Sequence, residues 1–161
     1  MKEYFAYGSN LNLGQMARRC PESFAVQTAR LEGYELAFRC GVLTILPKEG
    51  SHVDGLIWSI SEQDERQLDR YEGFPRLYGK ETVSVQGASG TTYAVLVYIM
   101  EEPWRARPQE PSGLYLDTVL EGCLRTGVPR EPVLEALDRC RGEAQQCSSP
   151  EKCSKQQISG R

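Results

Sequence analysis

One glutamate stands out as a candidate for proton transfer among the 22 acidic residues of this 161-residue chain. Glu72 follows Leu68 by four positions, so on a helix the two side chains share a face that also includes Tyr71. Glu72 is also the last residue before Gly73, where we expect the helix to end and its negative dipole end to lie. Burial and the dipole both disfavour a charged carboxylate, so both raise its pKa toward the range useful for general acid–base catalysis. The alternative is an exposed glutamate at a helix end with no chemical role.

Other catalytic groups are disfavoured by their surroundings. His52 is the only histidine, and the segment "KEGSHVDG" around it is typical of an exposed turn, which argues against a Ser–His or Cys–His pair. Ser9 lacks the glycines of a Gly-x-Ser-x-Gly elbow, and the chain has neither a Gly-x-Gly-x-x-Gly fingerprint nor a Walker loop. If the protein is an enzyme, a carboxylate is therefore the best candidate for proton transfer.

The start of the chain, "YFAYGSN", holds a second candidate site. Residues 4–7 predict a strand, Gly8, Ser9 and Asn10 are turn formers, and Asn12 is a good N-cap for a short helix that ends before Pro21. Unpaired backbone N–H groups at such a turn can bind a ligand carboxylate or a developing oxyanion. The alternative is that these residues only shape the turn.

The remaining segments predict an α+β fold in which a curled sheet or small barrel is packed by helices. We expect strands at 33–40 and 55–60 and a helix at 61–73. A hairpin should follow from "KETVSVQ" and "TTYAVLVYIM", then helices after Ser112 and from Pro132 onward. We expect one domain over residues 1–141 and a polar, flexible tail over residues 142–161.

Composition narrows the class of protein. The net charge of −3 disfavours nucleic acid and anionic membranes as partners, and no apolar run is long enough to span a membrane. No leader-like segment precedes the first strand, so we expect a cytoplasmic location. The six cysteines include no Cys-x-x-Cys pair, and we therefore expect reduced thiols and no metal site.

Three segments in order resemble the gamma-glutamylcyclotransferase family, which includes AIG2-like and butirosin-pathway members. They are "YFAYGSNLN" (4–12), "LDRYEGFPRLY" (68–78) and "PSGLYLDTVL" (111–120). The segments "RLEGYELAF" and "VDGLIWSIS" fall between them in the expected order, and the resemblance extends to about residue 125. The opening "YGSN" is closer to the gamma-glutamylcyclotransferase branch than to the gamma-glutamylamine or glutathione-specific branches.

The resemblance implies a small mixed β-barrel flanked by helices, with a substrate cavity at one end. It implies that Glu72 is the general acid–base and that the opening loop binds the substrate through backbone amides. It also implies that two tyrosines line the pocket. The substrate-binding residues so implied are Tyr7, Gly8, Ser9, Asn10, Leu11, Tyr78 and Tyr115.

The reaction implied by the resemblance is an intramolecular cyclisation. The α-amine of a γ-glutamyl amide attacks its own γ-carbonyl, which gives 5-oxoproline and releases an amine or amino acid without a cofactor or metal. A homodimer is possible, and the identity of the leaving amine stays open. Two alternatives remain: a non-catalytic small-molecule-binding protein of the same fold, and a nucleotide-binding protein that uses residues 8–10 for phosphate. The missing glycine fingerprint and the absence of a nearby lysine disfavour the second.

Overall fold

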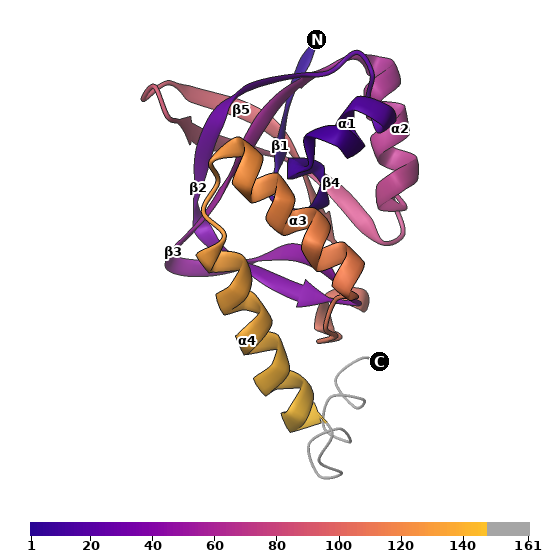
Figure 1. Cartoon of the computed structure of the whole chain (residues 1–161), viewed down its shortest axis with the longest axis vertical. Helices are drawn as coiled ribbons and strands as arrows, with labels where there is room; N and C mark the ends of the chain where they lie inside the picture. Colours follow the sequence, from indigo (N-terminus) through magenta and orange to yellow (C-terminus); the bar gives the residue numbers. More distant parts are fainter. Residues whose placement is uncertain (148–161) are drawn as a thin grey trace.

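The sheet closes into a five-stranded barrel with the strand order β1-β3-β2-β4-β5. The structure is a computed structural model, and it describes residues 1–147 (Figure 1). The strands are β1 (Lys2–Ala6), β2 (Phe24–Arg39), β3 (Val42–Ile60), β4 (Tyr78–Gly87) and β5 (Thr92–Met100). Neighbouring strands are antiparallel except β1 and β5, which pair in parallel through Tyr4 and Leu96. The predicted α+β class and the small mixed barrel flanked by helices are confirmed.

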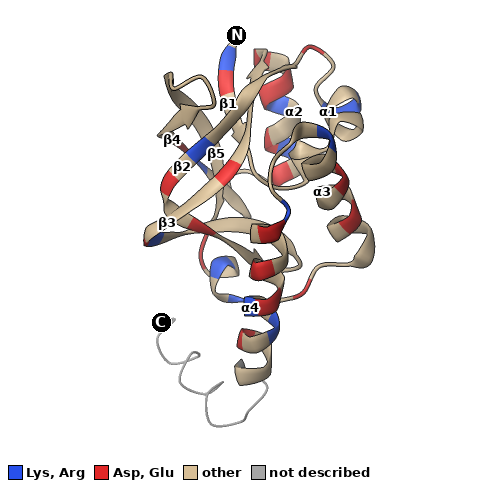
Figure 2. Cartoon of the chain, turned by 60° about the vertical axis from the view of Figure 1, so that its left-hand side comes forward, with Lys and Arg blue, Asp and Glu red and all other residues tan. Residues whose placement is uncertain are grey.

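Four α-helices pack outside the barrel in the described part of the chain. They are α1 (Leu13–Arg19), α2 (Glu62–Glu72), α3 (Gly113–Thr126) and α4 (Glu131–Cys147), with short 3₁₀ helices η1 (Ser9–Leu11) and η2 (Trp104–Ala106). Figures 1 and 2 show α1 and α2 side by side at one side of the barrel. Figure 2 also shows acidic and basic residues on both strands and helices, with both signs on α4.

Local signals set the two ends of α2. The Ser61 hydroxyl accepts a hydrogen bond from the Asp64 N–H, and the Asp64 carboxylate accepts one from the Ser61 N–H, which is a capping box. At the other end, Gly73 adopts the left-handed conformation with φ 65°, which favours glycine. Leu68 is fully buried, so the helix is fixed in rotation about its axis, and Glu72 is its last residue, as predicted.

Strands β2 and β3 are longer than the sequence predicts. The segment around His52, predicted as a turn, belongs to β3, and His52 pairs with Glu32 across the sheet. The next pair on the β2 side joins Tyr34 to Pro47, so residues 48–51 bulge opposite Gly33. Gly33 has a φ of 85°, a left-handed backbone conformation that residues with a side chain avoid. Cross-strand pairing therefore outweighs the low strand propensity of this polar segment.

Helix α3 fixes the opening loop from outside. A Cβ on Gly122 would lie 2.7 Å from the carbonyl carbon of Leu11, so the helix backbone packs directly on the loop. The Asn12 side chain caps α1 by accepting from the Gln15 N–H (3.0 Å) and donates to the Thr118 carbonyl (3.1 Å). Leu11 is fully buried in this contact. Both α1 and α3 therefore contact the loop and hold it in place.

The predicted domain end at residue 141 falls within a helix. Helix α4 continues through Gly142 to Cys147, and the Glu143 carboxylate binds the buried Arg39 guanidinium at 2.8 Å. Residues 142–147 are therefore helical rather than irregular. The rest of the predicted tail, residues 148–161, lies outside the described residues, and the division into domain and tail stays a prediction.

Three general expectations can be compared with residues 1–147. Cys20, Cys40, Cys123 and Cys140 are free thiols there. No described helix combines the length and apolar character needed to cross a membrane. Within the same residues, no group of three or more His, Cys, Asp or Glu side chains is arranged to hold a metal ion.

Candidate active site

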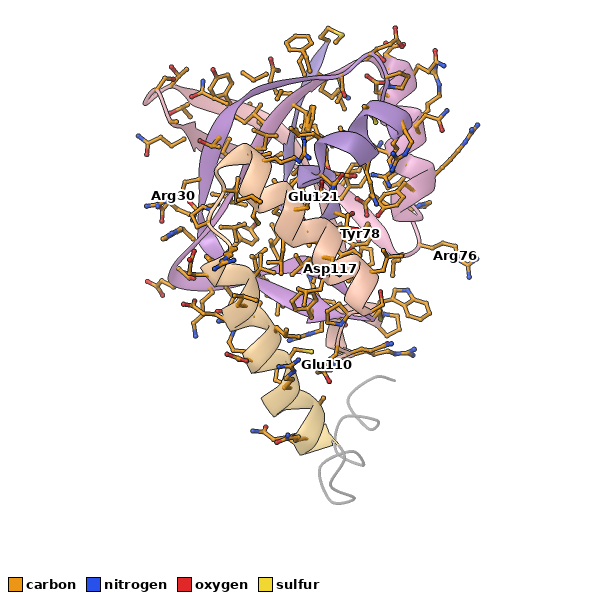
Figure 3. All side chains as sticks on the ribbon, viewed as in Figure 1. Arg30, Arg76, Tyr78, Glu110, Asp117 and Glu121 are labelled. Carbon is orange, nitrogen blue, oxygen red and sulfur yellow. The ribbon has the colours of Figure 1, made fainter. Side chains whose placement is uncertain are left out.

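One cavity of about 210 Å³ brings the opening loop and the end of α2 together, although they are about sixty residues apart. Every predicted site residue except Leu11 lines it: Tyr7, Gly8, Ser9, Asn10, Glu72, Tyr78 and Tyr115. In Figure 3, Arg76 projects away from the body of the protein, whereas Tyr78, two residues later, lies inside it. The loop that follows α2 therefore turns back into the barrel just where the cavity forms.

Glu72 is the acidic residue of this cavity. It is partly exposed because it borders the cavity, but protein atoms surround its carboxyl group. Burial raises the pKa of Glu72 to about 7, while the nearby Arg19 guanidinium acts in the opposite direction. The side-chain amide of Asn10 donates to Oε1 of Glu72 at 3.4 Å. Glu72 is thus suited to exchange a proton near neutral pH.

The opening loop presents backbone to the cavity from one side. The Leu11 N–H donates to the Gly8 carbonyl (3.0 Å) and the Asn12 N–H donates to the Ser9 carbonyl (3.0 Å), which closes η1. The N–H groups of Ser9 and Asn10 begin this 3₁₀ helix, so they have no partner inside it. Leu11 is different: its N–H is used by the turn and its side chain is buried beneath α3. Leu11 therefore anchors the loop rather than lining the cavity.

The predicted tyrosines form hydrogen bonds to backbone groups around the cavity. Tyr7 donates to the Tyr98 carbonyl (2.5 Å), and Tyr78 donates to the Leu43 carbonyl (2.6 Å). The Leu43 N–H donates to the Tyr115 hydroxyl (3.0 Å). Burial raises the pKa of Tyr7, Tyr78 and Tyr115 above the usual tyrosine range. These hydroxyls therefore stay protonated near neutral pH and link several elements into one wall.

Six lining residues were not singled out from the sequence: Tyr4, Val42, Leu43, Tyr71, Leu77 and Tyr98. Tyr71 and Leu77 lie inside the segment 68–78 that carries the family resemblance, so that segment could have indicated them. Val42 and Leu43 begin β3 and reach the cavity only because the barrel closes. No periodicity marks Tyr4 or Tyr98, since neighbouring residues of β1 and β5 are buried as well. Tyr4 does lie in the segment 4–12 that carries the resemblance, whereas Tyr98 lies in none of those segments.

The fold and the cavity define a class: a small five-stranded barrel protein in which one cavity is lined by both the opening loop and a single carboxyl group, that of Glu72. A model of the family "Gamma-glutamyl cyclotransferase, AIG2-like" matches residues 4–117. The chain is 29% identical over 140 residues to the gamma-glutamylcyclotransferase of Bos taurus, and 29% to that of Homo sapiens. Each alignment covers 80% of this chain and 73% of the relative.

A solved structure described as a gamma-glutamyl cyclotransferase has the same fold. It superposes with a TM-score of 0.70 at 24% identity, covering 87% of this chain and 86% of the other. The chain belongs to the AIG2-like gamma-glutamyl cyclotransferase family, which confirms the resemblance found in the sequence. It is an enzyme of the gamma-glutamylcyclotransferase type.

Proposed function

We propose that this protein cyclises a γ-glutamyl amide to 5-oxoproline and releases an amine or amino acid, with Glu72 as general acid–base. The observation that carries the proposal is the meeting of the Glu72 carboxyl group and the opening loop in one cavity. The raised pKa of Glu72, to about 7, supports the assigned role. The names of the curated relatives support the substrate class.

The proton balance of the reaction needs one group that both accepts and donates. The α-amine nitrogen forms a bond to the γ-carbonyl carbon and loses a proton to the Glu72 carboxylate. The bond from that carbon to the leaving nitrogen then breaks, and Glu72 returns the proton to this nitrogen. A carboxyl group with a pKa of about 7 has both forms populated near neutral pH, so it serves both steps.

The opening loop is proposed to bind the oxyanion of the tetrahedral intermediate. The Ser9 and Asn10 N–H groups are the donors that the turn itself leaves unused. Losing one such donor typically raises the barrier by about 3 kcal/mol. Gly8 leaves room beside them, since a Cβ there would lie 3.3 Å from the Tyr115 hydroxyl and 3.5 Å from Cβ of Leu43. A side chain at this position would narrow the cavity.

The size of the cavity supports an intramolecular reaction. The attacking amine and the γ-carbonyl belong to the same substrate, so the enzyme has only to hold the γ-glutamyl group folded. A cavity of about 210 Å³, walled by tyrosines and by Val42, Leu43 and Leu77, restricts the extended forms of such a group. The leaving amine or amino acid stays open. The cytoplasmic location, the independence from a cofactor and a possible homodimer remain predictions from the sequence.

The direct test is product analysis on a library of γ-glutamyl amino acids and γ-glutamyl amines. Mass spectrometry should detect 5-oxoproline and the matching free amine from at least one member. Glu72→Gln keeps the shape of the side chain and removes the titrating group, so turnover should fall at least ~100-fold while the fold is kept. Glu81→Gln is the matched control, because Glu81 is exposed on β4, and it should keep wild-type turnover. Near wild-type turnover by Glu72→Gln would refute the assigned role.

A further inference from the structure

We propose that Arg19 is a positioning residue for Glu72: it fixes the side-chain amide of Asn10 and clamps the end of α2 against the opening loop. Arg19 is the last residue of α1 and does not line the cavity. It therefore acts on the reaction through its neighbours rather than by touching the substrate. The role in turnover rests on the proposed function, whereas the effect on Glu72 does not.

The guanidinium of Arg19 is held by three contacts. One N–H donates from Nη1 to Oδ1 of Asn10, and another donates from Nη2 to Oε1 of Gln15 at 3.0 Å. The group also lies over the ring of Tyr71, with Cζ 3.4 Å from the ring centroid. Gln15 stands one helical turn before Arg19, so α1 itself orients the guanidinium toward the loop.

The contact with Asn10 decides which way its amide faces. A guanidinium has only donors, so it holds the amide oxygen on its own side and directs the amide NH₂ to the other side. That NH₂ donates to the Tyr4 hydroxyl (2.9 Å) and to Oε1 of Glu72 (3.4 Å). Without Arg19 the amide is free to turn over, which would place its oxygen against the carboxylate. Arg19 thus keeps a donor facing Glu72.

The contact with Tyr71 adds a second link to the same loop. Tyr71 immediately precedes Glu72 at the end of α2, and its hydroxyl is 2.8 Å from Oγ of Ser9. The stacked guanidinium therefore joins α1 to α2, while the two hydrogen bonds join both helices to residues 9 and 10. Figure 1 shows α1 and α2 adjacent at this side of the barrel. Losing Arg19 removes the stacking on Tyr71, which joins the two helices, and the hydrogen bond to Asn10, which joins α1 to the opening loop.

Charge supports the same role. Four buried tyrosines are close enough to Glu72 to interact with its charge. They are Tyr4 on β1, Tyr7 just after β1, Tyr78 on β4 and Tyr115 on α3. Burial raises the pKa of each of them above the usual tyrosine range, so they stay neutral where Glu72 titrates. The charge acting on Glu72 is that of Arg19, which lowers the pKa of Glu72 against the larger effect of burial. Removing this charge should therefore raise the pKa of Glu72 further.

The test compares Arg19→Met and Arg19→Lys with Arg18→Met. Arg18 is exposed on the same helix, so its replacement removes the same charge without the contacts. The pKa of Glu72 is measured by ¹³C NMR of the glutamate carboxyl groups, with Glu72→Gln to assign the signal. Arg19→Met should raise the pKa by roughly 1 unit. Arg18→Met should leave it unchanged.

Turnover provides the second measurement. In Arg19→Met, the midpoint of the pH profile of kcat/KM should rise with the NMR value, and turnover at pH 7 should fall by roughly tenfold. Arg19→Lys keeps the charge but not the planar, forked contact, so the pKa should return toward wild type while turnover stays low. An unmoved pKa in folded Arg19→Met, or an equal shift in Arg18→Met, overturns the proposal. If Arg19→Met does not fold, wild-type turnover in Arg19→Lys overturns it.

The two measurements separate this proposal from the proposed function. The NMR titration needs no substrate, so it decides whether Arg19 sets the state of Glu72 whatever the reaction is. If the wild-type protein forms no 5-oxoproline from any γ-glutamyl amide, the proposed function fails and the titration still stands.

Discussion

The Glu72 carboxyl group is expected to lower the stability of the fold at alkaline pH, and Glu72→Gln should recover that stability. Burial raises the pKa of Glu72 from the usual 4.5 to about 7. Each unit of difference between the folded and unfolded states corresponds to about 1.4 kcal/mol, so the full effect is about 3 kcal/mol. Glutamine has the same shape and stays neutral at every pH, and the Asn10 amide can donate to its oxygen as it does to Glu72.

The sign follows from which state binds the proton. Below pH 4.5, Glu72 is protonated in both the folded and the unfolded state, so its ionisation contributes nothing to the difference. Between pH 4.5 and about 7 the unfolded chain releases the proton and the folded protein keeps it, so stability falls as pH rises. Above about pH 7 both states are ionised, and the wild-type protein carries the whole loss.

Urea unfolding of the wild-type protein and Glu72→Gln at pH 4 and pH 8.5 measures this difference. The two proteins should have nearly equal free energies of unfolding at pH 4, and the variant should be about 3 kcal/mol more stable at pH 8.5. That difference corresponds to a rise in Tm of roughly 6–12 °C. Comparing the two at each pH cancels the titration of all other groups, and Glu81→Gln should show no such divergence. A difference that does not change with pH would refute the reasoning, because it would mean that the Glu72 carboxyl is not held neutral by burial.

Two further predictions concern the packing around the site and the end of the chain. Gly122→Ala should lower the free energy of unfolding by roughly 1–3 kcal/mol and reduce turnover, because the added Cβ would displace the opening loop. Gly142→Ala has open space at its Cβ, so it should be neutral or stabilising by up to ~1 kcal/mol. Urea unfolding of both variants measures these changes. A chain that ends after Cys147 should keep wild-type Tm and turnover, whereas Glu143→Ala should lower Tm by a few degrees because it leaves the buried Arg39 without its carboxylate partner. A large loss on truncation, or equal effects of the two glycine variants, would contradict these expectations.

The elements that the sequence predicts well are those with local signals at both ends. Helix α2 has Ser61 and Asp64 at its start and Gly73 at its end, and these residues act within one turn of where they stand. Glu72 could therefore be placed on its helix from spacing alone. Its meeting with the opening loop was implied by the family resemblance, since nothing local connects residues sixty positions apart.

The parts that could not be predicted depend on contacts between distant segments. Residues 48–51 look like a turn because Lys, Glu, Gly and Ser favour one. They stay within β3 because the pairs on either side of them, Tyr34–Pro47 and Glu32–His52, hold the chain along β2. Val42 and Leu43 reach the cavity through barrel closure. Arg18 and Arg19 are adjacent in sequence, and only Arg19 lies at helical spacing from Asn12 and Gln15. That spacing is the signal that would have indicated which of the two arginines contacts the site.

The chemistry proposed for Glu72 and its unfavourable effect on stability have one physical origin. A carboxyl group left in water would keep its usual pKa and would rarely hold a proton for the leaving nitrogen at neutral pH. A carboxyl group buried without any charge nearby would hold its proton too tightly to accept one from the amine. Burial raises the pKa of Glu72 and Arg19 lowers it, and the balance falls at about 7. Arg19 can act this way only because α1 and α2 meet at the opening loop, so the packing that shapes the cavity also sets the pKa of Glu72.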